Sequence, residues 1–208
     1  MSFDRGVLDA NVLAYALNVD APQHAASLAL LEAASDPSVT LYVTSQILCE
    51  LYSVITNPRR VAVASSSAEA LGALADILAL PGMQVLPTPA GVVPGWMSLL
   101  RRHPVVGGSV FDLQIVATML ANGINRIYTF NGDDFNVFSE LVEPLAPCGL
   151  SAAASYPAHS FTRFCTSARK RSTNPSTYAA MSSDGSSTSG VRSMPKLRAL
   201  SSSVPCGA

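Results

Sequence analysis

Four carboxylates in this 208-residue chain stand beside or directly after apolar runs: Asp9, Glu50, Asp112 and Asp134. Charged residues make up only 13% of the chain, and no Lys or Arg is adjacent to these acids in the sequence. A carboxylate among buried apolar residues must be hydrated in a cleft, paired with a cationic group or bound to a metal ion. The pattern therefore indicates a divalent metal site.

Metal-dependent cleavage of a phosphodiester needs three or four carboxylates that converge on one point. Such carboxylates hold Mg²⁺ or Mn²⁺, which prefer oxygen ligands. The metal lowers the pKa of a bound water and neutralises phosphate charge. Asp9, Glu50, Asp112 and Asp134 are the predicted catalytic and metal-binding residues.

Each acid also has an ordinary structural interpretation when it is taken alone. Asp9 can cap a helix, Glu50 can lie on the solvated side of a helix, and Asp112 can be a first-turn acid favoured by the helix dipole. Asp133 and Asp134 can form a turn. The combination of all four acids favours the metal site more strongly than any single one.

Short apolar strands alternate with helical patterns in the order β-α-β-α-α-β-α-α-β. The predicted strands cover residues 6–9, 39–43, 83–86 and 126–129. The predicted helices cover residues 22–35, 45–56, 65–80, 96–102 and 109–121. This order predicts an α/β fold, a three-layer α/β/α sandwich with a mainly parallel central sheet. Ligands in such sheets bind beyond the carboxyl ends of the strands, where Asp9, Asn131 and Asp134 are expected.

Composition divides the chain into two parts. Residues 1–147 are predicted to form one globular domain, and residues 148–208 are a Ser/Ala/Arg-rich low-complexity tail that we expect to be disordered. Residues 1–150 carry six Lys or Arg against thirteen Asp or Glu, a net charge of −7. Residues 151–208 carry seven against one, a net charge of +6. Such a tail either binds RNA or is a non-functional extension, and its abrupt composition favours the second interpretation.

Several classes of protein are disfavoured. No apolar run reaches the roughly 18–20 residues that span a bilayer, and the N-terminus has no signal-peptide pattern. The four cysteines form no zinc-ligand spacing. We therefore expect a cytoplasmic protein with no membrane association.

Four segments carry a resemblance to a known family. They are Leu8–Tyr15, Ser45–Pro58, Phe111–Ala117 and Thr129–Phe135. In order and spacing they resemble the PIN-domain ribonucleases, and within them the VapC-type toxins of toxin–antitoxin pairs. The resemblance covers roughly residues 5–147.

The resemblance implies a role for each acid. Asp9, Glu50 and Asp112 would be the three core acids of the family's metal site, and Asp134 would match the fourth acidic position. Asn131 would be a nearby ligand or substrate contact. If Asn131 is instead the true fourth position, the site loses one charge and holds a single metal.

The implied activity is Mg²⁺- or Mn²⁺-dependent endoribonuclease cleavage of RNA by the toxin of a type II toxin–antitoxin system. The implied partners are an RNA substrate, a cognate antitoxin protein and a second copy of the chain in a homodimer. Thr129 and Asn11 would support the carboxylates. Arg59 and Arg60, which follow the Glu50 helix, are predicted phosphate contacts, with a solvated helix end as the alternative.

Four other protein classes are alternatives to a PIN-domain ribonuclease. A haloacid-dehalogenase-like phosphatase needs a second acid two residues after the first, where Asn11 stands, and a Lys, which residues 1–150 lack. A receiver domain needs such a Lys too. A DNA-directed nuclease of the flap-endonuclease type would need more acids. A degenerate PIN-like binding module without catalysis would keep the fold and lose the metal.

Overall fold

The computed structural model describes residues 4–147. The predicted low-complexity tail, residues 148–208, lies outside the described residues. The strands are β1 (Gly6–Leu8), β2 (Leu41–Val43), β3 (Met83–Val85), β4 (Arg126–Tyr128) and β5 (Glu143–Leu145). The helices are α1 (Ala10–Leu17), α2 (His24–Ala33), α3 (Ser45–Ile55), α4 (Ser67–Leu78), α5 (Val92–Arg102), α6 (Ser109–Ala121) and α7 (Gly132–Asn136).

The strands form one sheet in the order β3-β2-β1-β4-β5, and every strand pair is parallel. In this register Val7 of β1 lies opposite Tyr42 on one side and Ile127 on the other. All three residues of β1 are buried. An apolar strand covered on both faces is typical of a parallel sheet between two helix layers.

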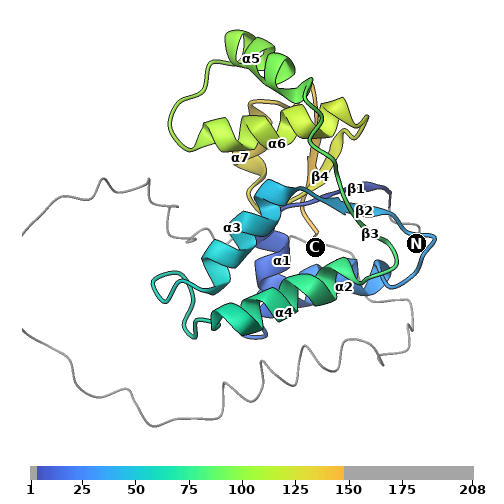
Figure 1. The fold of residues 1–208 in the computed structure, drawn as a ribbon, viewed down its shortest axis with the longest axis vertical. Helices are drawn as coiled ribbons and strands as arrows, with labels where there is room; N and C mark the ends of the chain where they lie inside the picture. The colour runs from blue at the N-terminus through green and yellow to red at the C-terminus, as the bar shows by residue number, and fades with distance from the viewer. Residues whose placement is uncertain (1–3, 148–208) are drawn as a thin grey trace, which may run out of the picture.

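The helices cover the two faces of the sheet in two groups, as Figure 1 shows. Helices α1 to α4 lie on one side, where α1 contacts α2 and α3, and α3 contacts α4; α5 to α7 lie on the other side. The predicted three-layer α/β/α sandwich is thus confirmed. The chain builds outward from β1 through β2 to β3 and then crosses back to β4, so the strand order reverses between β1 and β4.

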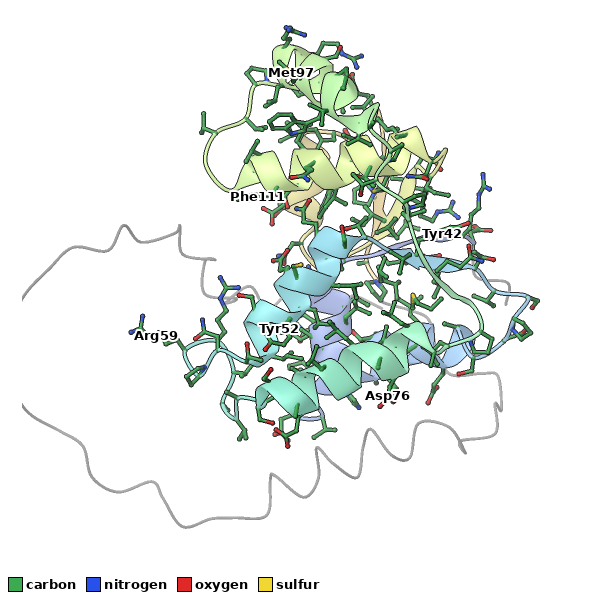
Figure 2. All side chains as sticks on the ribbon, in the orientation of Figure 1. Tyr42, Tyr52, Arg59, Asp76, Met97 and Phe111 are labelled. Carbon is green, nitrogen blue, oxygen red and sulfur yellow. The ribbon has the colours of Figure 1, made fainter. Side chains whose placement is uncertain are left out.

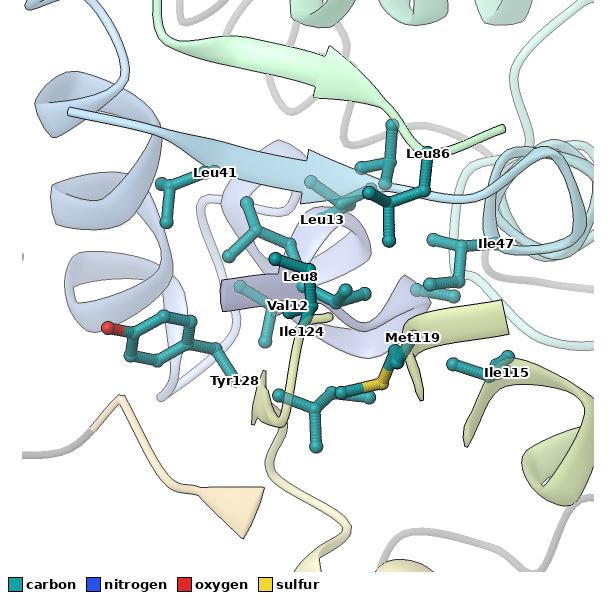
Figure 3. Close-up of a cluster of buried hydrophobic side chains, with 14 of the residues drawn as sticks. Leu8, Val12, Leu13, Leu41, Ile47, Leu86, Ile115, Met119, Ile124 and Tyr128 are labelled. Atoms are coloured by element: carbon teal, nitrogen blue, oxygen red, sulfur yellow. The ribbon is translucent and has the colours of Figure 1, made fainter. Parts of the chain in front are cut away.

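The hydrophobic core fixes the elements that carry the acids. Leu8 of β1, Leu13 of α1, Ile47 of α3 and Ile115 of α6 are all fully or almost fully buried (Figure 3). Burying an aliphatic side chain of this size stabilises the fold by about 1.5–3 kcal/mol. Each helix that carries a predicted acid is therefore anchored within a few residues of that acid.

Three elements were missing from the predicted order. Helix α1 is only eight residues long and is apolar at every position except Asn11, so its sequence shows no polar face. Helix α7 is a five-residue turn of helix. Strand β5 contains Pro144, which lowers strand propensity and is tolerated here because β5 is an edge strand.

The predicted boundaries of two helices were also displaced. Helix α5 begins at Val92 rather than Trp96, with Pro94 in its first turn, where proline costs no helical hydrogen bond. Helix α4 begins after Ser66, whose hydroxyl accepts from the Glu69 backbone N–H in a capping box. Within residues 4–147, no helix has the length and apolar character that crossing a membrane requires.

Candidate metal-binding and catalytic site

Asp9 stands at the point where the strand order reverses. It directly follows β1 and caps the N-terminus of α1. Its backbone N–H donates to the Tyr128 carbonyl of β4 at 3.0 Å, so the end of β1 is tied to the neighbouring strand. Ligands of open α/β sheets bind in the crevice at such a reversal. Only 8% of Asp9 is exposed.

Three hydrogen-bond donors hold the Asp9 carboxylate. Its Oδ1 accepts from the Ala10 backbone N–H at 2.6 Å. Its Oδ2 accepts from Asn11 Nδ2 and from the Thr129 hydroxyl, each at 2.6 Å. Asn11 Nδ2 also donates to Thr129 Oγ1 at 3.0 Å, and its Oδ1 accepts from the Phe130 backbone N–H at 3.2 Å. The carboxylate is therefore fixed in one orientation.

Glu50 and Asp112 come from opposite helix layers. Glu50 lies in α3, Asp112 lies in the first turn of α6, and both are partly buried. Gln46, one helical turn before Glu50, donates from Nε2 to the Phe111 carbonyl at 2.9 Å. This bond links α3 to α6 directly beside the two acids. Sequence analysis missed Gln46, although its spacing of four residues from Glu50 places both on one helix face.

Asp134 approaches the other acids from α7. Its side chain is exposed, and its charge raises the pKa of Asp9, Glu50 and Asp112. Asn131 precedes α7, and its backbone N–H donates to Thr129 Oγ1 at 3.0 Å. Asp133 is exposed and accepts from Asn136 at 3.1 Å, which is the ordinary turn role.

Burial is the largest cause of the raised pKa values of Asp9 and Asp112. Burial, together with the charges of Glu50 and Asp134, raises the pKa of Asp9 to about 6, although the hydrogen bond from Thr129 opposes the rise. Burial also raises the pKa of Asp112 to about 7, with added repulsion from Asp134, Asp9 and Glu50. The four carboxylates thus form one electrostatic unit, although they come from four separate elements.

Glu50 differs because a cation is nearby. Burial raises its pKa, and the positive charge of Arg60 opposes that rise. Arg60 lies in the turn after α3, and its side chain is exposed. Arg59 is also exposed, and Figure 2 shows it in the same outer loop, pointing away from the helices. Of the two arginines, Arg60 is the one whose charge reaches an acid of the cluster.

The acids fit a hard divalent cation by the chemistry of their donors. All four supply carboxylate oxygens, the ligands that Mg²⁺ and Mn²⁺ prefer. Within residues 4–147, none of the four forms an ion pair with Lys, Arg or His. In the same range, no three His, Cys, Asp or Glu side chains lie close enough to form a ready-made metal site. A bound ion would therefore have to draw the more mobile acids toward the fixed Asp9.

The remaining basic residues lie apart from the acids. Arg101 and Arg102 end α5 and are exposed, as expected for cations at a helix C-terminus. His103 Nε2 lies 3.2 Å from Glu140 Oε1, so this histidine has a carboxylate partner outside the cluster.

A family model decides where this chain belongs. The PIN domain model matches residues 6–141, which is more than half of the chain. The chain belongs to the PIN domain family. The matched range of this PIN domain contains all four acids and the sheet reversal between β1 and β4.

Solved structures similar to this PIN domain include three VapC or VapBC proteins. One is VapC20 of Mycobacterium tuberculosis, described as a toxin that cleaves the sarcin-ricin loop. It is 22% identical to this chain, and the TM-score is 0.48. The match covers 63% of this chain and 92% of that chain. VapBC2 from Rickettsia felis, bound to a fragment of promoter DNA, is 19% identical, with coverage of 68% and 98% and a TM-score of 0.48.

VapBC-1 from nontypeable Haemophilus influenzae is 15% identical, with coverage of 69% and 98% and a TM-score of 0.48. Identities this low carry no information on the substrate. A search of curated protein sequences finds no match.

Proposed function

We propose that this PIN domain protein is a metal-dependent endoribonuclease, the toxin of a type II toxin–antitoxin system. The observation that carries the proposal is the mutual repulsion of Asp9, Glu50, Asp112 and Asp134 at the sheet reversal. Holding four acids together raises the free energy of the folded protein unless a cation compensates. Strongly perturbed acids at the carboxyl ends of parallel strands are typical of functional sites.

The proposed cofactor is Mg²⁺ or Mn²⁺, held by Asp9, Glu50, Asp112 and Asp134. When bound, such an ion activates a water molecule and neutralises charge on the scissile phosphate. Thr129 and Asn11 hold the Asp9 carboxylate in a fixed orientation. Asn131 is the alternative fourth ligand, and this choice determines whether the site takes one ion or two.

The proposed substrate is RNA. An acidic cluster repels a polyanion, so the chain must supply phosphate contacts elsewhere. Arg60 and Arg59 are the proposed contacts, since both are exposed in the loop after the Glu50 helix. The two arginines would hold phosphates that flank the cleavage position, and the metal would bind the scissile phosphate.

The proposed partners are a cognate antitoxin and a second copy of the chain. Four clustered acids attract a cationic side chain, and complementary charge across an interface favours fast and specific association. An antitoxin Lys or Arg placed among the acids would occupy the position of the metal. Inhibition would then require no change of fold.

Cleavage of a total-RNA preparation by the full-length chain tests this proposal. We expect cleavage with Mg²⁺ or Mn²⁺, none with chelator, and loss of at least about 100-fold in Asp9→Asn, because metal neutralisation of charge is worth several kcal/mol. Asp76→Asn is the matched control, since it makes the same chemical change on the exposed surface of α4 (Figure 2).

Equal cleavage by Asp9→Asn would contradict the proposal. Cleavage of single-stranded DNA in preference to RNA would favour a DNA-directed nuclease. A degenerate binding module is the second candidate function, and it is favoured by the absence of a ready-made three-ligand cluster within residues 4–147. A folded protein that binds no Mn²⁺ would establish that module.

A further inference from the structure

Phe111 is an aromatic side chain that the fold leaves largely uncovered. It is 56% exposed. Within residues 4–147, every other Phe, Tyr and Trp is buried or partly buried. Fully burying a side chain of this size would be worth about 1.5–3 kcal/mol. At Phe111 the fold forgoes a large part of that gain.

That position is beside the acids. Phe111 immediately precedes Asp112 in the first turn of α6. Its carbonyl accepts the Gln46 hydrogen bond from α3, so its backbone is held from the opposite layer. Figure 2 shows Phe111 at the end of α6 nearest to α3, which carries Glu50. The exposed ring is therefore attached to a fixed backbone at the edge of the acidic cluster.

A cation lies on another side of the same cluster. Arg60 lies in the turn that follows α3, the helix that carries Glu50, and its side chain is exposed. The cluster is thus bordered by an exposed ring on the α6 side and an exposed guanidinium beyond the α3 side. Proteins that bind single-stranded nucleic acid combine these two features, phosphate contacts and aromatic surfaces on which bases stack.

We propose that Phe111 is a stacking surface for an unpaired nucleobase next to the scissile phosphate and so helps determine which RNA segments the site accepts. This inference rests on the proposed function. A base inside a duplex is already stacked on both faces and cannot use the ring. The site therefore selects unpaired segments through stacking, while the phosphate contacts stay independent of sequence.

Kinetics of the full-length chain on a short unpaired RNA and on the same RNA in a duplex test this inference. In Phe111→Leu, which keeps an apolar side chain but loses the flat ring, KM for the unpaired RNA should rise roughly 5- to 100-fold, the size of one lost base stack. The value of kcat should change much less. Phe111→Tyr keeps the ring and should restore the affinity.

Leu71→Ala is the matched control. Leu71 is 58% exposed, almost the same as Phe111, but lies on α4. Its replacement should leave KM and kcat unchanged. Equal KM values in Phe111→Leu and the unmodified protein, with cleavage intact, would overturn the stacking role while leaving the nuclease standing.

A fluorescence titration tests stacking without catalysis. The chain contains a single Trp, Trp96, which is partly buried. Phe111→Trp in the Asp9→Asn background adds an exposed indole, whose emission should be quenched by an unpaired oligonucleotide and much less by a duplex or inorganic phosphate. Leu71→Trp in the same background should show no quenching.

Three results of these experiments overturn the inference. Equal quenching by duplex and unpaired RNA would show that no base stacks on the ring. Quenching only by a protein partner would assign the ring to a protein interface. Failure of the unmodified chain both to cleave and to bind RNA would remove the proposed function and this inference together.

Discussion

Asp9 and Thr129 are separated by 120 positions in the chain and joined by one 2.6 Å hydrogen bond in the fold. Thr129 is 1% exposed, and its hydroxyl also accepts from Asn11 and from the Asn131 backbone N–H. The Thr129 hydroxyl therefore connects the Asp9 carboxylate, the Asn11 amide and Asn131 at the start of α7. Its removal should change both the stability of the fold and the pKa of Asp9.

Thr129→Val keeps the shape of the side chain and removes its hydroxyl. Leaving buried partners unsatisfied costs about 1–3 kcal/mol each, so the melting temperature should fall. The pKa of Asp9 should rise further, because the Thr129 hydrogen bond lowers it. The acidic limb of the cleavage pH profile should then move to higher pH.

Thr118→Val is the control for that experiment. Thr118 is also buried, and its hydroxyl donates to the Gln114 carbonyl within α6 at 3.0 Å. The Thr118→Val protein should be somewhat less stable, but the pH profile of its RNA cleavage should not shift. A shift of equal size in both variants would show that Thr129 acts only through stability.

The raised pKa of Asp9 also predicts how stability changes with pH. The folded protein binds the Asp9 proton more tightly than the unfolded chain, whose pKa is 3.8 against about 6. Stability therefore falls as pH rises through this window. The loss should be on the order of 3 kcal/mol.

Denaturant unfolding at pH 5 and pH 8 measures the part of this loss that falls above pH 5, which is roughly half of it for a folded pKa of about 6. Asp9→Asn should gain stability relative to the unmodified protein as pH rises, because the amide has no charge to bury. Saturating Mg²⁺ should reduce the difference, since it compensates the charge. A difference that does not change with pH would contradict the raised pKa.

At the scale of elements, the acids stood out in the sequence because each is placed against an apolar pattern. The apolar run of β1 stops at Asp9, and Glu50 interrupts the apolar face of α3. Helix α1 escaped prediction because it is short and apolar at every position except Asn11, so its sequence shows no polar face. Strand β5 escaped because Pro144 hides an edge strand. The role of the acids in a metal site stays a prediction, whereas the long elements that carry Glu50 and Asp112 were predicted correctly.

The contact between Gln46 and Phe111 was beyond sequence reasoning for a different reason. Its two residues lie 65 positions apart, in helices of opposite layers. Only the crossing of the chain from β3 back to β4 brings α6 next to α3. The hydrophobic periodicity of either helix therefore gives no indication of the contact between Gln46 and Phe111.

Gln46→Ala should lower cleavage several-fold while the melting temperature changes little. The bond is exposed, so its net contribution to stability is about 0.5–1.5 kcal/mol at most. Its loss lets α3 and α6 move independently, and small displacements of catalytic groups are costly. Gln84→Ala on edge strand β3, also exposed, should leave cleavage unchanged. Identical rates for both variants would show that the bond does not position the acids.

At the scale of the molecule, the fold class followed from the alternation of strands and helices, and the place of the site followed from the parallel sheet. The reversal between β1 and β4 puts Asp9 and Thr129 on adjacent strand ends. Helices α3, α6 and α7 then bring one acid each. What the sequence did not contain was the hydrogen-bond network of Asn11 and Thr129 that fixes Asp9 among these elements.

The net charge of −7 over residues 1–150 acts on the same site. An acidic body attracts divalent cations and cationic partners and repels free RNA, and all three effects weaken with added salt. In the proposed function the two charges have separate roles. The acids would bind the cation, and the exposed Arg60 would bind phosphate.

The central claim is that four carboxylates from four elements form one metal site, and Mn²⁺ titration by calorimetry tests it most directly. Full-length protein should bind Mn²⁺ more tightly at pH 8 than at pH 5.5, because protons compete at Asp9 and Asp112. Asp9→Asn and Asp112→Asn should each lose most of this binding, while Asp76→Asn should keep it. Equal binding in all four proteins, or no binding by the folded chain at either pH, would contradict the claim.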